Sequence, residues 1–325
     1  MSGADVLDRV IEAPIITSFT RIGSGIRRRL DDWTDLDSYE LTGRTIVLTG
    51  ATSGLGLAAA EQLARCAASV VLVGRTPAKT SRVRDQLAAA TGNEGLTTAN
   101  ADMGDLDAVR TLGEELADRH DRIDVLVHNA GALSAERRES PQGIEATVAS
   151  QVVGPFLLTT LLLEPLRAGS PGRVLTMSSG GMYSAGLTVD GLQMDEHSYN
   201  GTKQYALAKR AQVTLNAMWA ERVDRDEIVF HALHPGWADT PGVAKSLPTF
   251  RRVVGPLLRS PAEGADTLVW LAADDGDPLS SSGDFWHDRR RRGLHKLRKT
   301  RTADTPERRD RLWRWAQHAA EIHPA

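Results

Sequence analysis

Short apolar runs rich in β-branched residues alternate with helix-like segments from residue 43 to about residue 275. This alternation predicts strands joined by right-handed helical crossovers, which make consecutive strands parallel. Helices then cover both faces of the sheet, so we expect an α/β fold with a doubly wound parallel sheet. Such sheets bind ligands at the carboxyl ends of their strands. The expected strands cover residues 45–48, 70–73, 96–99, 123–127, 174–177 and 228–233, and the expected helices 55–68, 77–90, 105–119, 144–166 and 204–222.

Length and composition are those of an ordinary globular protein. With 325 residues the chain can bury a large core in a single domain. Its hydrophobic share of 41% and charged share of 25% argue against disorder, and a net charge of -3 does not favour nucleic acid as a partner. The single cysteine, Cys66, excludes an intramolecular disulfide and suits a reducing compartment.

The sequence has no feature typical of export or membrane insertion. The N-terminus lacks the basic start and apolar run of a secretory signal. The longest apolar stretch, residues 152–163, is too short to cross a bilayer. We therefore expect a cytoplasmic protein.

Two extensions flank the alternating region, so we divide the chain into residues 1–42, 43–288 and 289–325. In the first, apolar residues recur at helical spacing among arginines, which predicts helix with one apolar and one basic face. The favoured interpretation packs the apolar face on the protein body or a second subunit, and the alternative is a helix on a membrane surface. The apolar positions are Ile15, Phe19, Ile22, Ile26, Leu30 and Trp33, and the basic ones are Arg21 and Arg27 to Arg29.

The last segment begins with a basic run. Residues 289–301 hold eight lysines or arginines and no acid. We consider three interpretations: a solvated loop, which is favoured, a contact with an anionic membrane surface, and a site for an anionic substrate such as an acyl-CoA. Thr305 and Pro306 then predict the cap and first residue of a C-terminal helix.

A glycine-rich turn follows the first expected strand and opens the first expected helix. The sequence from Thr49 to Gly56 reads TGATSGLG. Glycines at these positions permit a tight turn and close approach of the backbone to a pyrophosphate, while the helix N-terminus offers unpaired N–H groups. The turn therefore predicts a dinucleotide-binding site.

The end of the second expected strand indicates which dinucleotide is bound. An acid at this point would bind the 2′-hydroxyl of NAD, whereas an arginine can pair with the 2′-phosphate of NADP. Here Gly74 replaces the acid and Arg75 follows. We therefore expect NADP(H) rather than NAD(H) as the cofactor, and no metal.

Tyr205 and Lys209 lie four residues apart, on one face of an expected helix. A cation beside the phenol would stabilise phenolate and lower the pKa of Tyr205 from about 10 towards neutrality. Tyr199 and Lys203 repeat the same spacing, but Asn200-Gly201 between them reads as a turn, so we favour the first pair. Ser179 follows the strand at 174–177, where a hydroxyl can bind a substrate carbonyl.

Taken together, these motifs resemble the short-chain dehydrogenase/reductase family over residues 43 to about 290. The features that match are Thr49 to Gly56, Asp102, Asn129-Ala130-Gly131, Ser179, Tyr205 with Lys209, and Pro235-Gly236 with Thr240. Residues 178–182 and 234–242 are most similar to the branch called dehydrogenase/reductase member twelve. The resemblance implies a Rossmann-like single domain with N- and C-terminal helical extensions.

The resemblance also implies roles for individual residues. Tyr205 would act as general acid or base, Lys209 would lower its pKa and hold the nicotinamide ribose, and Ser179 would orient the carbonyl. The implied cofactor-binding residues are Gly50, Thr52, Ser53, Gly54, Leu55, Gly56, Arg75, Asp102, Met103, Asn129, Ala130, Gly131, Tyr205, Lys209, Pro235, Gly236, Trp237 and Thr240.

One position departs from the family pattern. Many members have an asparagine three residues before a glycine in the long helix, where it anchors a proton-relay water, and this chain has Gln151 before Gly154. We count Gln151 among the catalytic candidates. Because glutamine adds a methylene, a nucleotide-binding protein with little turnover stays open as the alternative function, as does a membrane-associated scaffold.

The substrate and partners are predicted only by class. Trp237 and the 180–200 loop would edge the pocket, which favours a bulky apolar alcohol, ketone or aldehyde. The helices at 144–166 and 204–222 resemble the pair that forms family interfaces, so we expect a homo-oligomer unless the tails cover them. Peripheral contact with an anionic membrane is a further hypothesis, and no nucleic-acid partner is expected.

Overall fold

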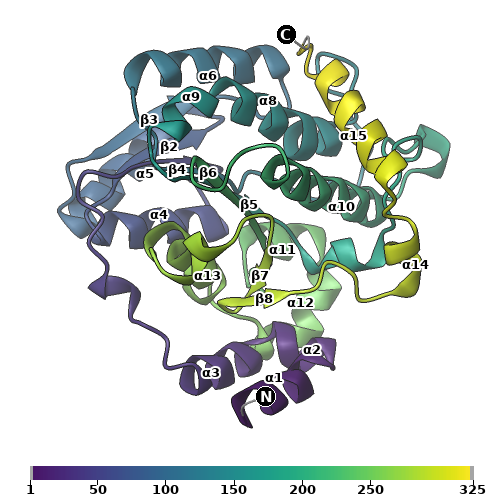
Figure 1. Cartoon of the computed structure of the whole chain (residues 1–325), viewed down its shortest axis with the longest axis horizontal. Helices are drawn as coiled ribbons and strands as arrows, with labels where there is room; N and C mark the ends of the chain where they lie inside the picture. The colour runs from purple at the N-terminus through teal and green to yellow at the C-terminus, as the bar shows by residue number, and fades with distance from the viewer. Residues whose placement is uncertain (1–2, 323–325) are drawn as a thin grey trace.

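The computed structural model describes residues 3–322, and these form one doubly wound α/β domain with helical extensions at both ends (Figure 1). The sheet has eight strands in the order β3-β2-β1-β4-β5-β6-β7-β8. All neighbours pair in parallel except β7 and β8, which form an antiparallel hairpin. The strands are β1 Thr45–Thr49, β2 Ser69–Gly74, β3 Leu96–Asn100, β4 Val125–His128, β5 Gly172–Met177, β6 Ile228–Leu233, β7 Phe285–His287 and β8 Arg290–Arg292.

Helices cover both faces of this sheet, as the alternation predicts. One face packs against α4 (Gly54–Arg65), α5 (Pro77–Thr91) and α13 (Pro261–Ala273), and the other against α6 (Leu106–Arg119), α8 (Gly154–Leu161) and α10 (Gly201–Ala220). Side chains of a strand alternate between the two faces, so in β1 Val47 joins one core and Ile46 and Leu48 the other. The remaining helices are α7 Ala146–Val148, α9 Leu163–Arg167, α11 Pro241–Ser246, α12 Pro248–Val254, α14 Arg298–Thr302 and α15 Pro306–Ala319, with short turns of helix at Leu36–Ser38, Gly180–Ser184, Glu196–Ser198, Gly255–Leu257 and Asp277–Ser280.

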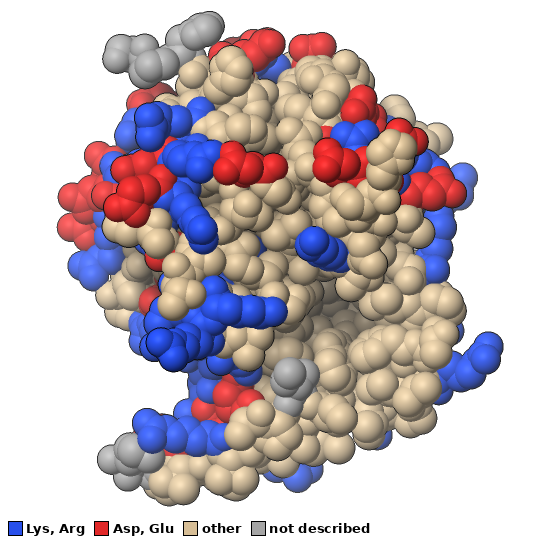
Figure 2. Space-filling view, turned by 90° about the vertical axis from the view of Figure 1, so that its right-hand side faces the viewer, with Lys and Arg blue, Asp and Glu red and all other residues tan. Residues whose placement is uncertain are grey.

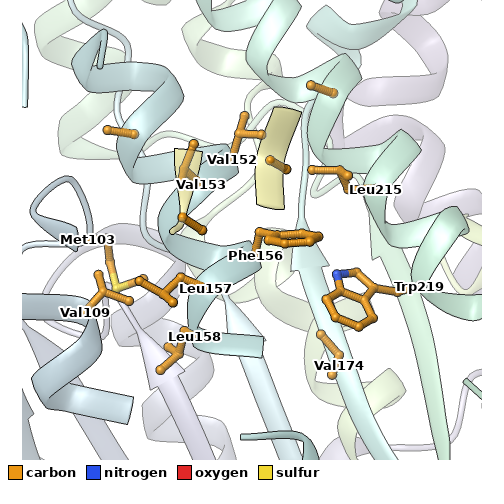
Figure 3. Close-up of a cluster of buried hydrophobic side chains, with 14 of the residues drawn as sticks. Met103, Val109, Val152, Val153, Phe156, Leu157, Leu158, Val174, Leu215 and Trp219 are labelled. Atoms are coloured by element: carbon orange, nitrogen blue, oxygen red, sulfur yellow. The ribbon is translucent and has the colours of Figure 1, made fainter. Parts of the chain in front are cut away.

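The core on the α8 and α10 face is built around an aromatic pair. Phe156 of α8 and Trp219 of α10 lie 5.2 Å apart between ring centroids, and Figure 3 shows them above Val174 of β5. Leu157 and Leu158 of α8 extend this core towards α6. The contacts fix α10 against the sheet, and α10 carries Tyr205 and Lys209.

The single long helix that we expect at 144–166 is interrupted. Residues Ala149–Val153 form a π turn between α7 and α8, and the Gly154 N–H bonds to the Ala149 carbonyl. Pro155 has no N–H to give to the carbonyl of Gln151, and a proline ring clashes with the carbonyl four residues before it, so the widened turn avoids both. Gln151 therefore lies in the π turn and not in a regular helix.

The C-terminal helix α15 begins at the predicted cap, since the Thr305 hydroxyl accepts a bond from the Arg308 N–H at 3.3 Å. It packs on α10 and on the π turn. Trp313 contacts Phe156 and Trp219, with centroids 5.0 and 4.8 Å apart. Part of the surface that we expect to form an interface between subunits is thus covered by the chain's own tail.

The N-terminal extension forms three short helices, α1 (Gly3–Glu12), α2 (Ile15–Phe19) and α3 (Arg21–Leu30), at the bottom of Figure 1. Its faces differ in part from those that we predict. Arg27 is fully buried and Ile22 is exposed, which departs from an apolar inner face and a basic outer face, although Phe19 is buried and Arg21, Arg28 and Arg29 are exposed as predicted. The cause is a buried cluster of charges between this extension and the β7–β8 hairpin.

Asp288 lies at the centre of that cluster and is buried. Its carboxylate pairs with Arg27 at 2.6 Å and with Arg259 at 2.5 Å, and Arg27 also pairs with Asp8 at 2.7 Å and Glu12 at 2.8 Å. Burial acts to raise the pKa of the Asp288 carboxyl, but His287 and the guanidinium groups of Arg259 and Arg27 hold it well below its usual range. A buried charge needs such compensation.

The basic run joins the same cluster instead of forming a solvated loop. Three of its first four arginines, Arg290–Arg292, form strand β8, so the sheet continues past residue 288. Arg289 is buried against Asp266 at 2.8 Å, and Arg292 pairs with Asp8 at 2.6 Å. Lys296 pairs with Glu12 at 2.6 Å. Much of the basic run therefore holds the N-terminal acids in place.

The cluster gives a stability prediction. Asp288→Asn keeps the shape of the side chain and tolerates the backbone φ of 53° at this position, but leaves buried Arg259 without a counter-charge. We expect the free energy of unfolding to fall by about 3–5 kcal/mol in urea titrations at neutral pH. The control is Asp277→Asn, which removes one of the two acidic partners of the partly exposed Arg291 and should cost about 0–1 kcal/mol. Equal losses in the two variants would contradict the assigned role of Asp288.

Candidate active site

The predicted site residues gather at the carboxyl ends of β1, β4, β5 and β6. The glycine turn leaves β1 with Gly50 at a φ of 69° and enters α4 at Gly54, whose φ is 55°. Both values favour glycine. A side chain at Gly56 would collide with the carbonyl of Gly50, so this glycine is required for close packing of helix on turn.

Asn129, after β4, holds the glycine turn in place. Its side-chain amide donates to the Thr49 carbonyl at 3.0 Å and to the Gly50 carbonyl at 3.3 Å. The Thr49 hydroxyl in turn accepts the backbone N–H groups of Asn129 and Ala130 at 3.0 and 3.1 Å. The amide of Asn129 is thus a structural support for the turn.

Thr240 lies beside the same turn. A Cβ placed on Gly54 would be 3.4 Å from the Thr240 side chain, which caps α11 by accepting a bond from the Val243 N–H. The side chain of Ser53, at the N-cap of α4, makes no capping bond, so the first N–H groups of α4 are not satisfied by it. The structure thus brings the first and last cofactor motifs of the sequence together.

Arg75 and Asp102 meet at the ends of β2 and β3. Their charged groups are 3.7 Å apart, and the Arg75 side chain is 76% exposed. Gly74 has no room for a side chain, because its Cβ would meet the Thr80 hydroxyl and the Thr52 methyl. An acid could not replace Gly74 without a shift of these neighbours.

Tyr205 and Lys209 share one face of α10, and the Lys209 ammonium lies 5.5 Å from the centroid of the Tyr205 ring. The second Tyr-x-x-x-Lys frame has a different geometry. Asn200 is the N-cap of α10, so Tyr199 lies outside the helix, where its hydroxyl donates to Glu145 at 3.1 Å. Only the first pair faces a common surface.

The electrostatics around Tyr205 differ from the expectation that its pKa falls towards neutrality. For the protein chain, burial raises the pKa of Tyr205 to about 12, and a hydrogen bond with Ser179 lowers it only in part. Burial also lowers the pKa of Lys209 to about 7. Burial thus makes Lys209 easier to deprotonate, which weakens the electrostatic support that it gives to a phenolate.

Ser179 occupies the end of β5 and caps the short helical turn that follows, where its hydroxyl accepts the Gly181 N–H at 3.2 Å. The hydrogen bond with Tyr205 places the two hydroxyls together. Ser179, Tyr205 and Lys209 thus form one constellation.

Gln151 is also buried, in the π turn that packs against α10. Its side-chain N–H donates to the Ala132 carbonyl at 2.8 Å, and its side-chain oxygen has no partner among the described residues. Gly131 is adjacent, since a Cβ there would lie 3.0 Å from the Gln151 amide carbon. The Gln151 side chain, which is longer than the asparagine of the family pattern, fits here because it packs against Gly131. Nearby, the carbonyl of Met103 approaches Gly154 closely.

The sequence prediction missed a buried polar stripe behind Lys209. The Lys209 ammonium donates to the Met177 carbonyl at 2.8 Å and to the Gln212 side-chain oxygen at 3.0 Å. Gln212 and Asn216 follow Lys209 at helical spacing. This spacing of polar residues along one side of the helix could have predicted the stripe from the sequence.

The stripe borders a small internal cavity. The side-chain nitrogen of Gln212, both amide atoms of Asn216 and His128 Nδ1 are buried with no partner among residues 3–322. All three residues line a cavity of about 20 Å³ between α8, α10 and the sheet. One water needs roughly 10–15 Å³ of such volume and two to four polar partners, so the cavity suits a single water.

A second missed contact comes from the N-terminal extension. The Phe19 carbonyl accepts the Trp237 N–H at 2.7 Å, and the Phe19 ring lies 5.8 Å from the Trp237 ring. Arg259 donates to the Pro235 carbonyl at 3.3 Å and packs so closely on Gly236 that a side chain there would collide with it. The loop after β6 is thus held by α2 and by the buried charge cluster.

Comparisons with known proteins agree with this arrangement. A family model described as short chain dehydrogenase matches residues 44–249. The human protein named dehydrogenase/reductase SDR family member 12 is 35% identical over 273 residues, which cover 84% of this chain and 85% of the relative. Mouse retinol dehydrogenase 14 is 32% identical over 265 residues, covering 76% of this chain and 78% of that protein.

The fold has a solved counterpart. A crystal structure of a short chain dehydrogenase from Escherichia coli CFT073, complexed with NADPH, superposes with a TM-score of 0.64. The two sequences are 24% identical, and the match covers 79% of this chain and all of the other. The likeness confirms the doubly wound α/β fold.

The low pKa of Lys209 gives a prediction of pH dependence. In the folded chain the pKa is about 7 and the reference value is 10.5, so between these values the unfolded chain binds more protons. Stability that depends on Lys209 should therefore rise with pH, by up to about 1.4 kcal/mol per pH unit. In urea unfolding from pH 7 to 10, the free energy of unfolding of wild type should increase relative to that of Lys209→Met.

The matched control is Lys203→Met, in the exposed first turn of the same helix, for which the difference from wild type should stay flat with pH. A pH-independent gap between wild type and Lys209→Met would show that Lys209 is charged throughout in the folded protein.

Proposed function

This chain belongs to the short chain dehydrogenase family, whose members are oxidoreductases acting on CH–OH groups, and from this premise we propose that it transfers a hydride between NADP(H) and a bulky apolar carbonyl or alcohol. The observation that carries the proposal is the constellation of Ser179, Tyr205 and Lys209 beside the glycine turn. The experiment that tests it is turnover of apolar ketones, aldehydes and alcohols with NADPH or NADP.

The glycine turn fits a dinucleotide. Positive φ at Gly50 and Gly54, together with the packing of Gly56, lets the backbone approach a pyrophosphate closely. The uncapped first turn of α4 adds N–H donors and the positive end of the helix dipole. Thr240, Asn129 and the Pro235–Trp237 loop would border the nicotinamide end, and Asp102 and Met103 the adenine end. When bound, the nicotinamide supplies or accepts the hydride.

Arg75 supports NADP(H) as the form that is used. Its exposed guanidinium stands at the end of β2, where a 2′-phosphate would accept charge-assisted hydrogen bonds. The space beside Gly74 excludes the acid that would favour NAD. The related Escherichia coli protein is described as complexed with NADPH, in line with this choice.

Tyr205 would move the proton. With a pKa of about 12, its phenol is protonated at neutral pH, so Tyr205 is prepared to donate a proton to the oxygen of a carbonyl as hydride reaches the carbon. Ser179 would donate a hydrogen bond to the same oxygen. Lys209 would bind the cofactor ribose and, in its ammonium form, stabilise the phenolate that remains. This arrangement favours carbonyl reduction when NADPH is available.

An apolar surface supports a bulky apolar substrate. Figure 2 shows a hollow in one face of the molecule, above the N-terminal helices, and most of its rim is uncharged. Trp237, beside Phe19 and with its ring 5.0 Å from that of Phe250, gives the site an aromatic wall. The mouse relative is named a retinol dehydrogenase, which is consistent with a substrate of this class.

Assembly and location follow as further parts of the proposal. Family membership favours a homo-oligomer, but α15 covers part of the α8 and α10 surface, so contact between subunits would use the exposed remainder. Among the described residues, none of the helices has the length and apolar character needed to cross a bilayer. We propose a cytoplasmic protein that can associate with a membrane at its periphery.

Replacement of the proton donor tests the activity. Tyr205→Phe should lower kcat by about 10²–10⁴-fold, because proton transfer is lost while the packing of the ring is kept. The Kd for NADPH, from fluorescence titration, should stay within about twofold. Tyr199→Phe is the matched control and should keep wild-type turnover, since it removes only the contact with Glu145.

Another result would favour the second candidate function. If wild type bound NADPH but reduced no carbonyl in the panel, the chain would be a nucleotide-binding protein with little turnover. The partnerless side-chain oxygen of Gln151 is the observation that favours this candidate.

Cofactor choice is tested at Arg75. Wild type should show a higher kcat/KM with NADPH than with NADH. Arg75→Ala should reduce kcat/KM for NADPH by about 10–100-fold, because hydrogen bonds to a charged group are lost. The kcat/KM for NADH should stay nearly unchanged. Arg84→Ala, another partly exposed arginine, is the control. A wild-type preference for NADH would overturn the assignment.

A further inference from the structure

The first N-terminal helix, α1, is amphipathic, but its apolar side faces away from the body of the protein. In α1 the charged residues Asp8 and Glu12 face the protein, while Val6 and Val10 face outward. Val6 is 51% exposed and Val10 is 63% exposed. The helix therefore presents its apolar side to its surroundings.

The neighbouring helices add to this surface. Ile16 of α2 is 58% exposed and Ile22 of α3 is 44% exposed. Five of the seven large apolar side chains that are exposed in the described part of the chain lie in these three helices: Val6, Leu7, Val10, Ile16 and Ile22. We call these five residues the apolar face. Such a concentration of exposed apolar side chains is unusual, because on most protein surfaces exposed apolar residues are scattered singly.

The buried charge cluster explains why the face points outward. Asp8 pairs with Arg292 and Arg27, and Glu12 pairs with Arg27 and Lys296. These acids must face inward to neutralise the basic run, and α1 cannot turn its apolar side inward without breaking the pairs. The ion pairs thus fix the orientation of α1, because breaking them would leave buried charges without partners.

The exposed charged residues of the three helices that make no ion pair are basic, while the partly exposed Asp5 pairs with Arg290 at 3.5 Å. Arg9, Arg21 and Arg29 are exposed, and none of them lies in an ion pair with another residue of the 3–322 region. Asp8 is buried and Glu12 is engaged inside. In Figure 2 the lower part of the molecule, where Figure 1 places these helices, is mostly uncharged, with lysine or arginine at its edges and some acidic atoms beside them on the left.

We propose that the apolar face and its arginines dock the protein on an anionic phospholipid surface. Valine, leucine and isoleucine side chains on a short helix enter the boundary between headgroups and acyl chains, and arginines beside them bind the phosphates. Charge selects this occupant: the exposed charged residues of these helices that make no ion pair are arginines, so the apolar face and its arginines complement a surface that is apolar beneath and negative above. Docking does not depend on the proposed activity.

The docking face is connected to the loop that borders the site. Phe19, at the end of α2, accepts the Trp237 N–H, and the Phe19 ring also contacts His234 at 4.3 Å between centroids. The hollow of Figure 2 opens above these helices. A molecule dissolved in the bilayer would thus reach the opening of the candidate active site close to the apolar face.

Vesicle sedimentation of the full chain tests the proposal. Wild type should pellet with vesicles of phosphatidylcholine and phosphatidylglycerol, weakly with phosphatidylcholine alone, and less as salt is raised. Val6→Ser with Val10→Ser should weaken binding by about tenfold, because two apolar groups no longer leave water. Arg9→Gln and Arg21→Gln should each weaken it by about fivefold, the effect of one basic residue near anionic lipid.

The matched control lies in the basic run. Leu297 is 45% exposed and is followed by the exposed Arg298 and Lys299, so Leu297→Ser with Arg298→Gln and Lys299→Gln changes similar chemistry elsewhere. This variant should pellet like wild type. Circular dichroism and the midpoint of urea unfolding should be unchanged in every variant, because only exposed side chains are altered.

Three outcomes would overturn the proposal. The first is failure of wild type to pellet with anionic vesicles. The second is loss of pelleting in the Leu297 variant and not in the Val6 and Val10 variant, which would assign the membrane contact to the basic run. The third is a dimer in light scattering that the Val6 and Val10 variant dissociates, which would make the apolar face an interface between two copies of the chain.

Discussion

The contacts of the Asp288 carboxylate join three parts of this protein that are far apart in the sequence. The side chain is buried and pairs with Arg27 of the N-terminal extension and Arg259 before α13. Asp288 and Arg289 both have a φ of 53°, so the two-residue turn between β7 and β8 is left-handed at two non-glycine positions. Such a turn costs free energy, and the buried ion pairs of both residues with Arg27, Arg259 and Asp266 offset it.

The same cluster reaches the cofactor side of the fold. Arg259 packs against Gly236, and its guanidinium donates to the Pro235 carbonyl, so the loop after β6 rests on a charged group that is itself fixed by Asp288. Phe19 holds the next residue of that loop through the Trp237 N–H. The N-terminal extension is therefore part of the framework of the candidate site, and its reversed helix α1 is a consequence of the charges that the framework requires.

Burial has two opposite effects at the candidate site. It raises the pKa of Tyr205 to about 12, which keeps a proton on the phenol, and it lowers the pKa of Lys209 to about 7, which makes the ammonium easy to discharge. The Lys209 ammonium keeps two acceptors, Met177 and Gln212. Beyond Gln212 the polar stripe continues to Asn216 and the small cavity. Gln151, in its π turn, bonds to the carbonyl of Ala132.

The sequence by itself determined the doubly wound sheet and the glycine turn, because periodicity, turn residues and helix caps act over a few neighbouring positions. The same local signals predicted that Tyr205 shares a helix face with Lys209 and that Tyr199 lies outside the helix, and the role of Tyr205 stays a prediction. The sequence also indicated Arg75 and the start of α15. Tertiary structure alone decided which way α1 faces, since Arg27 and Asp288 are 261 positions apart and no local pattern reveals their pairing. It likewise decided the π turn at Gln151 and the pKa of Lys209, because both depend on what packs around the residue and not on which residues precede it.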